Sequence, residues 1–453
     1  MERINLLLYY PDIILLQPSK AAKNILSIPQ GAIITYGNGI YQRAHGLALP
    51  NITASYTLLD HTTRMKLPDT IAPVLRQLNI YLFEGYSYDC QRHWNIAGAV
   101  PKALQTGCTG QTAMLPVEKI IQVVQEGLAL GMRSVRLTGI PASGDPLLYS
   151  HFDTLLEQLE ASGTTVKVET SGTGMTPARA SKLGQYTNCE VRMVLAGADA
   201  ATHDALTGIP GNYRAVVSAA RMLSEEGTAL NIIFPVVRRN SGQVSRVIRQ
   251  AEQLGAASLL LIAVSPFHNL KANGAGLNGS NKAIEPLTVE ELIALGRKVE
   301  RQYQAQTRVK LLFDQPPAFR GLHPSARLEG QSTCDVTYSL SLLPDGMYTL
   351  CGMALYGGCV DEPDSCGLIL GNAGDTRLAE IWQSHPLLAA LRSGMSDRLS
   401  GVCEHCLVKS ACLGRCPIEN LQRTGSFWGP YWFCEAAERA GLFPAGRLVN
   451  NYW

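Results

Sequence analysis

Seven cysteines in the last third of the 453-residue chain stand at intervals that suit metal ligation. The first pair follows the pattern C-x11-G-x4-C, and a later group follows C-x2-C-x5-C-x3-C before one final cysteine. The residues are Cys334, Gly346 and Cys351, then Cys403, Cys406, Cys412, Cys416 and Cys434. Thiolates at such short intervals can surround one metal centre without an extended fold to bring them together. One zinc ion uses four thiolates, so seven indicate two centres, and we interpret them as ligands of two iron–sulfur clusters.

The composition is that of an ordinary soluble globular protein, with 46% hydrophobic and 17% charged residues and a net charge of +2. No basic stripe is present, so we expect no nucleic-acid partner. The longest apolar runs are far too short to span a bilayer, and the first residues lack the unbroken apolar core of a signal peptide. A cytoplasmic protein is therefore expected. Thiols stay reduced or bind metal there, so the twelve cysteines favour metal ligation over disulfides.

Helical and strand-like segments alternate between about residue 78 and residue 313. The expected strands are 78–83, 134–137, 165–169, 190–195, 230–237, 258–264 and 309–313, and the expected helices are 117–130, 147–159, 177–183, 213–226, 242–254 and 289–304. This alternation of strands and helices predicts parallel βαβ units in an α/β fold. Six or seven such units form an open or partial (β/α) barrel with its chemistry at the C-terminal strand ends. Residues 1–75 do not show this alternation, and we interpret them as a small N-terminal extension without an assigned role.

Residues 78–445 resemble the radical SAM/SPASM family of peptide-modifying enzymes. The resemblance rests on the cysteine pattern and on five further segments. These are VRLTG with GDPLL (135–148), VETSGT (168–173), LAGADAATHDALTGIPGNY (195–213), LPDGMYTLCGMALYG (343–357) and LGNAGDTRLAEIW (370–382). The resemblance implies a partial (β/α)6-type barrel over residues 76–320. It also implies a cysteine-rich SPASM domain with two auxiliary iron–sulfur sites over residues 321–453.

The catalytic signature of the family, C-x3-C-x2-C, is absent from the chain. In the family, three thiolates hold three irons and leave the fourth iron to chelate S-adenosylmethionine. The corresponding positions here are Tyr86, Cys90 and His93, and the other possible register pairs Cys90 with Trp94 and Ala97. Either register has only one thiolate, so we predict that the SAM-cleaving cluster is lost. Cys90 is then a buried small residue packed beside Tyr86 and His93.

Two other parts of the implied SAM pocket also depart from the family pattern. Four residues, 140–143, separate Gly139 from Gly144 and Asp145, and Pro141 removes a backbone donor. Ala196 precedes Gly197 where the family has an acidic residue. Gly139, Gly144 and Asp145 are interpreted as remnants of a SAM-binding motif, and SAM is not expected to bind. The barrel can still bind a peptide, because peptide binding requires shape and not a cluster.

Family usage divides the cysteines between two interleaved auxiliary sites. It implies that the first site uses Cys334, Cys351 and Cys416, and that the second uses Cys403, Cys406, Cys412 and Cys434. The second set is complete and suits a [4Fe–4S] cluster. The first lacks a fourth thiolate, which Cys359 or Cys366 could supply. Otherwise its iron is open to a substrate, water or a carboxylate.

Three functions follow as alternatives. The resemblance favours a pseudo-enzyme in the maturation of a ribosomally made peptide. It would bind the precursor peptide or an active partner enzyme, and relay electrons from a donor such as ferredoxin or flavodoxin. The second is an active peptide-modifying enzyme that uses the open auxiliary cluster or an atypical Tyr86/Cys90/His93 centre. The third is an interaction scaffold with structural clusters or with zinc, because zinc sites need only similar spacing.

Overall fold

The computed structural model describes residues 73–82, 114–139, 145–266, 285–320, 335–352 and 368–449, together with the backbone of three N-terminal strands. These strands, β1 (Ile13–Leu15), β2 (Ile33–Tyr36) and β3 (Gly39–Gln42), form a separate sheet. They belong to a compact unit of Met1–Ile71 and Gly321–Glu329, and the rest of the chain forms a second unit. Among the described residues, no helix is long and apolar enough to cross a membrane.

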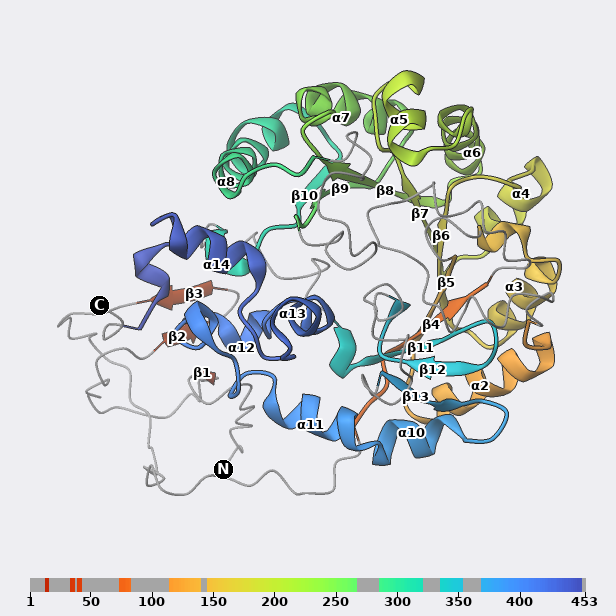
Figure 1. Ribbon diagram of the computed structural model, residues 1–453. Helices are drawn as coiled ribbons and strands as arrows, with labels where there is room; N and C mark the ends of the chain where they lie inside the picture. Colours follow the sequence, from red (N-terminus) through yellow and green to blue (C-terminus); the bar gives the residue numbers. More distant parts are fainter. Residues whose placement is uncertain are drawn as a thin grey trace, which may run out of the picture. The chain divides into compact units, whose positions relative to one another are not determined.

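The second unit contains a run of parallel strands that pair in chain order (Figure 1). They are β4 (Gln77–Tyr81), β5 (Ser134–Thr138), β6 (Thr165–Thr170), β7 (Cys189–Val194), β8 (Ala229–Val236), β9 (Ser258–Ala263) and β10 (Lys310–Phe313). The connecting helices are α2 (Val117–Ala129), α3 (Phe152–Ala161), α4 (Pro177–Gln185), α5 (Ala200–Thr207), α6 (Asn212–Glu225), α7 (Val244–Gln253) and α8 (Val289–Lys298). Seven parallel strands with connecting helices confirm the predicted α/β partial barrel.

Alternation along the strands separates the two faces of this sheet. On β6 and β7, Val166, Val168, Val191 and Met193 are fully buried, whereas the residues between them are partly exposed. Successive strand residues point to opposite faces, so the buried set forms the core beneath the helices. Figure 1 shows the helices on the outer side of the curved sheet. The partly exposed set therefore projects from the opposite, concave face.

Three helical segments differ from the sequence prediction. The expected helix 147–159 is divided into a 3-10 turn, η2 (Pro146–Leu148), and α3. The helix expected to end at residue 304 changes after α8 into a π-helical turn, η4 (Val299–Tyr303), and a 3-10 turn, η5 (Gln304–Gln306). Helix α5 was not predicted as a helix. Its start is capped by the side chain of Asp199, which accepts a hydrogen bond from the Thr202 amide at 2.9 Å.

The barrel sheet continues directly into the cysteine-rich segment. Strand β11 (Ser339–Leu342) pairs in parallel with β4 and places Leu340 opposite Leu78. Strands β12 (Met347–Thr349) and β13 (Ile369–Asn372) follow in antiparallel order and complete a ten-stranded sheet. The turn between β11 and β12 ends at Gly346, whose φ of 90° is a conformation that favours glycine. This glycine is the one in the C-x11-G-x4-C pattern.

Short helices follow the hairpin. They are α10 (Leu378–Ser384), α11 (Pro386–Gly394), η9 (Gly401–Cys403), α12 (Lys409–Cys412), α13 (Pro417–Thr424), α14 (Trp432–Arg439) and η10 (Ala445–Arg447). Helix α10 docks beside α2, where the Leu378 amide donates to a carboxylate oxygen of Glu126 at 2.7 Å. The fully buried Trp382 indole donates to the Pro73 carbonyl at 2.5 Å, just before β4. Both hydrogen bonds join α10 to the barrel.

Buried polar groups join α13 to the ends of β9 and β10. Arg415, which is 5% exposed, pairs with Asp314 after β10. Glu419 is 8% exposed and accepts a hydrogen bond from the Ser265 hydroxyl after β9. Its Oε1 atom is buried without a hydrogen-bond partner. Burial raises the pKa of Glu419 to about 7, although the nearby Arg423 and Arg415 act in the opposite direction.

The parallel pairing of β11 with β4 predicts that β11 contributes to the barrel core. Replacement of the fully buried Leu340 by alanine should lower the free energy of unfolding by roughly 2–5 kcal/mol, because it leaves a cavity in the junction. The matched control is Leu148→Ala, at a side chain that is 54% exposed. Chemical denaturation of both variants tests this prediction. Equal, small losses in the two variants would show that β11 is not part of the core.

Glu419 predicts a pH dependence of stability. Its pKa is higher in the folded state than in the unfolded state, so the folded chain holds a proton that the unfolded chain releases, and stability falls as pH rises from about 4.5 to about 7. Glu419→Gln removes this loss. Relative to the wild type, the variant should gain about 2 kcal/mol between about pH 5 and about pH 7.5.

Denaturation midpoints at the two pH values provide the measurement. Glu157→Gln serves as the control, because that carboxylate side chain is 61% exposed. A stability difference between Glu419→Gln and the wild type that does not change with pH would contradict the prediction.

Candidate metal centre

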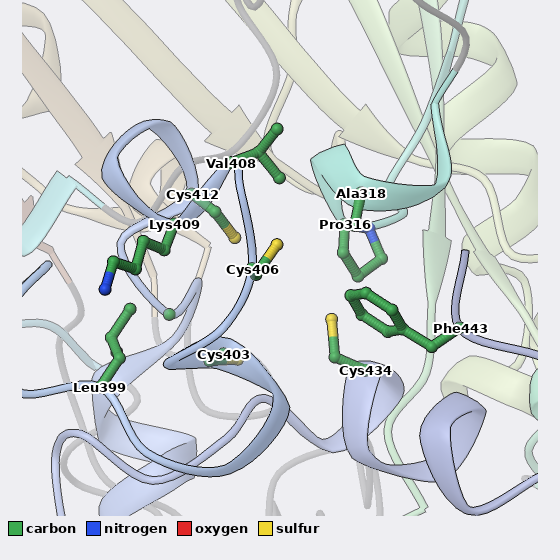
Figure 2. A pocket seen from close by; sticks show the side chains of 11 residues that line it. Pro316, Ala318, Leu399, Cys403, Cys406, Val408, Lys409, Cys412, Cys434 and Phe443 are labelled. Atoms are coloured by element: carbon green, nitrogen blue, oxygen red, sulfur yellow. The ribbon is translucent and has the colours of Figure 1, made fainter. Parts of the chain in front are cut away.

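Four cysteines from separate segments surround one cavity (Figure 2). They are Cys403, Cys406, Cys412 and Cys434, the set that family usage assigns to the second auxiliary site. The cavity encloses about 280 Å³, part of which is open to solvent. The remaining lining residues are Pro316, Ala318, Leu399, Val408, Lys409, Gly414 and Phe443. In Figure 2 the sulfur atoms of Cys406, Cys412 and Cys434 point into the space between their elements.

Local backbone structure positions each thiol. Cys403 ends the 3-10 turn η9, and Cys406 forms an isolated β-bridge with Leu448 near the C-terminus. Cys412 is the last residue of α12, and Cys434 lies in the first turn of α14. All four are between 4% and 8% exposed. The cavity is therefore a buried site assembled by tertiary packing.

A left-handed turn follows Cys412. Residues 413–415 have φ angles of 54°, 68° and 64°, and two of them, Leu413 and Arg415, are not glycine. Such a conformation is uncommon outside glycine, and it persists only where the surrounding structure enforces it. The turn reverses the chain between Cys412, which lines the cavity, and Cys416, which begins α13 and does not line it. Cys412 and Cys416, which are neighbours in the cysteine motif, therefore differ in whether they line the cavity.

The four thiols interact with one another electrostatically. A hydrogen bond between the side chains of Cys403 and Cys434 lowers the pKa of Cys403 and raises that of Cys434. Burial raises the pKa of Cys412 to about 12, and it also raises the pKa of Cys406. Apposed buried thiolates repel one another, so the group needs a positive centre before it can ionise fully. The charge of a metal centre would supply it.

Donors and cations around the thiols favour that ionised state. Backbone amides of Tyr431, Val408 and Gly414 donate to the sulfurs of Cys403, Cys406 and Cys412 respectively, and each hydrogen bond lowers the pKa of its thiol. Four cations lower these pKa values further, namely Arg423, Arg447, Lys409 and Arg320. Hydrogen bonds and charge near cysteine sulfurs set the potential of iron–sulfur clusters. The surroundings of the thiols therefore fit a bound cluster.

One aromatic side chain lines the cavity. It is Phe443, and the aromatic residues at positions 427–433 are not among the lining residues. The Phe443 ring lies 5.4 Å from that of Phe319, which in turn lies 5.1 Å from Phe433. Phe443 follows α14 in a turn. Nothing in its sequence neighbourhood distinguishes it from an ordinary core residue.

Two of the residues assigned to the first auxiliary site lie within the described part of the chain. Cys351 follows β12, and Cys416 starts α13; both are half-buried. The hydroxyl of Tyr81, at the end of β4, accepts a hydrogen bond from the Gly352 amide at 3.0 Å. A side chain at Gly352 would overlap this hydroxyl, so the close approach requires glycine. Burial and the neighbouring Cys351 raise the pKa of Tyr81.

The other predicted site residues are Tyr86, Cys90, His93, Gly144, Cys334, Cys359 and Cys366, and they lie outside the described residues. Gly139 ends β5. Asp145 is buried, and its carboxylate accepts hydrogen bonds from the Thr170 hydroxyl at 2.7 Å, the Ser171 amide at 2.6 Å and the Leu147 amide at 3.0 Å. Burial raises the pKa of Asp145. The side chain thus ties the end of β6 to η2.

Comparisons with known proteins agree with this geometry. The model of SPASM, an iron–sulfur cluster-binding domain, matches residues 334–407. The AdoMet-dependent heme synthase of Methanosarcina barkeri is 22% identical over 71% of this chain and 87% of its own. The PqqA peptide cyclase of Ruegeria pomeroyi is 24% identical over 70% and 78%. The mycofactocin maturase MftC of Mycolicibacterium smegmatis is 27% identical over 60% and 64%.

Solved structures show the same fold. Streptococcus suis SuiB bound to its precursor peptide SuiA matches with a TM-score of 0.59 at 15% identity, over 80% of this chain and 76% of that one. Native anSMEcpe with bound AdoMet and a peptide matches with a TM-score of 0.56 at 17% identity, over 80% and 94%. The resemblance predicted from the sequence is confirmed. In its cluster-binding domain, its relatives and its barrel fold, the chain resembles the radical SAM/SPASM family.

Proposed function

We propose that the chain is an iron–sulfur protein of peptide maturation whose auxiliary clusters are its only redox centres. It binds a precursor peptide or an active partner enzyme and exchanges electrons with a cytoplasmic donor such as ferredoxin or flavodoxin. The observation that carries the proposal is the four-thiol cavity, in a chain whose SAM-cluster region has a single cysteine, Cys90. The relatives named as peptide cyclase and maturase support a peptide substrate.

The arrangement of thiols favours a cluster over zinc. Zinc holds thiolates at about 2.3 Å, which brings the four sulfurs within about 4 Å of one another. Cys403 and Cys434 are close enough to share a hydrogen bond, but across the described segments no three cysteine, histidine or acidic side chains are grouped so that they could hold a single metal ion. The four thiols instead line a cavity. A [4Fe–4S] cluster bound there would carry single electrons, and Cys403, Cys406, Cys412 and Cys434 would be its ligands.

The first auxiliary site would use Cys334, Cys351 and Cys416. Support comes from the left-handed turn that separates Cys416 from the second set, and from the position of Cys351 beside Tyr81 at the end of the first barrel strand. Its fourth ligand is Cys359, Cys366 or an exogenous group. We propose the same division of the chain as before: an extension over 1–75, the barrel over 76–320 and the cluster domain over 321–453.

Iron counting after anaerobic reconstitution tests the number of clusters. We expect about eight irons per chain, four in each site. Cys412→Ala should remove about four of them, because it takes a ligand from the second site. Cys189→Ala, at a buried thiol outside the cavity, should remove none. About twelve irons would contradict the loss of the SAM-cleaving cluster, and a colourless protein with one or two zinc ions would contradict both clusters.

SAM cleavage is tested separately. With a strong reductant and SAM, the reconstituted protein should release no 5′-deoxyadenosine above a protein-free control. Calorimetry should likewise detect no SAM binding, since only one of the three ligand positions holds a thiol. Release of 5′-deoxyadenosine that disappears in Cys90→Ala would instead establish an active centre at Tyr86, Cys90 and His93.

A further inference from the structure

The concave face of the barrel carries a group of charged side chains on three adjacent strands. They are Arg136 on β5, Glu169 on β6 and Arg192 on β7. Glu169 lies opposite Arg192 in the strand register. Their neighbours along the strands, such as Leu137, belong to the core beneath the helices. The charged side chains therefore project away from the helices.

One carboxylate faces two guanidinium groups in this cluster. Arg136 Nε lies 3.5 Å from Glu169 Oε1, and Arg192 Nη1 lies 3.6 Å from the same oxygen. Within the part of the chain that the structure describes, Arg136 Nε is buried without a hydrogen-bond partner. Guanidinium groups pair best with carboxylates through two short parallel hydrogen bonds. Both contacts to Glu169 are longer than such hydrogen bonds.

Accessibility of the cluster is intermediate. The side chains of Arg136, Glu169 and Arg192 are 28%, 27% and 26% exposed. Unsatisfied buried donors are rare in proteins and call for an acceptor such as water, an ion or a ligand. In a partly desolvated position, a charge pair is also stronger than at an open surface. The three side chains thus carry one net positive charge and one unsatisfied donor in a partly exposed position.

The cluster adjoins the first auxiliary site. Glu169, Arg136 and Cys351 all act electrostatically on the hydroxyl of Tyr81, so this tyrosine lies near both the charged cluster and the cysteine. The Tyr81 hydroxyl also accepts a hydrogen bond from the backbone amide of Gly352. A group bound by the two arginines would therefore lie at the end of the first barrel strand, near the segment that carries Cys351.

We propose that Arg136 and Arg192 form a carboxylate-binding site inside the barrel, which recognises an acidic group of the bound peptide. This inference rests on the proposed peptide-binding function and specifies the chemistry of its substrate. Glu169 is the internal competitor of that acidic group. It holds the two guanidinium groups in place, and it shares them with the ligand when the peptide enters.

Three capped tripeptides test the site by calorimetry on the cluster-loaded full chain. They are N-acetyl-Ala-Glu-Ala-amide, its glutamine counterpart, and the glutamine peptide with a free C-terminal carboxylate. The glutamate peptide should bind at least about tenfold more tightly than the glutamine amide, because hydrogen bonds from arginine to a carboxylate are stronger than those to a neutral amide. Equally tight binding of the free-acid peptide would identify a terminal carboxylate as sufficient, in accordance with the proposal.

Substitutions that should change the affinity for the glutamate peptide in opposite directions make the test more specific. Arg136→Gln and Arg192→Gln should each abolish the preference for glutamate. Glu169→Gln should instead increase affinity for the glutamate peptide several-fold, because it removes the competing carboxylate; a variant that merely disturbs folding would not. The matched control is Arg246→Gln, whose partner Asp199 lies 3.1 Å away on the exposed side of the molecule. It should leave binding unchanged.

The outcomes separate this inference from the proposed function. Equal affinity for the glutamate and glutamine amides would overturn the carboxylate site and leave peptide binding by the barrel intact. Weaker binding in Glu169→Gln would also overturn it, since the competitor would then be a ligand-binding group. Absence of binding for all three peptides would overturn the site and the peptide-binding role together, while the iron count would still test the clusters.

Discussion

The parallel pairing of β4 with β11 is the constraint on which both candidate sites depend. Without it, the cysteine-rich segment would be a separate module; with it, the barrel and the cluster domain share one ten-stranded sheet. The hairpin that follows β11 then extends the same sheet through β12 and β13. It brings Cys351 to the end of β4, where the Tyr81 hydroxyl accepts a hydrogen bond from the Gly352 amide. The position of Cys351, one of the ligands proposed for the first auxiliary site, therefore follows from strand pairing within the barrel.

The second constraint is the left-handed turn at residues 413–415. A continued helix after Cys412 would carry Cys416 one turn further along the same helical face, toward the same cavity. Three successive residues with positive φ reverse the chain instead, and a buried ion pair between Arg415 and Asp314 holds the turn against β10. The amide of Gly414 in this turn also donates to Cys412. One local conformation thus separates Cys416 from the residues that line the cavity and supplies a hydrogen bond to Cys412.

The sequence predicted those features whose signals are local. Short apolar runs that alternate with helices identified the barrel strands. Cysteine spacing identified a metal-binding segment, and the family resemblance implied which four thiols meet in the cavity. Features that depend on distant partners were missed. Phe443 lines the cavity only because α14 packs near η9, and the cluster of Arg136, Glu169 and Arg192 forms only when three strands align. Helix α5 was missed because its short run lacks a strong apolar periodicity, although Asp199 provides a cap.

The buried thiols allow a comparison within the chain. Cys189 and Cys412 are buried to a similar degree, and burial raises the pKa of each to about 12. Cys189 lies alone in the core, where a neutral thiol is a small apolar residue and needs no cation. Cys412 lies among three other thiols, with backbone donors and cations directed at the sulfurs. That surrounding stabilises negative charge, which neutral thiols do not have. These surroundings distinguish Cys412 from Cys189, and they fit thiolates that a metal centre would stabilise.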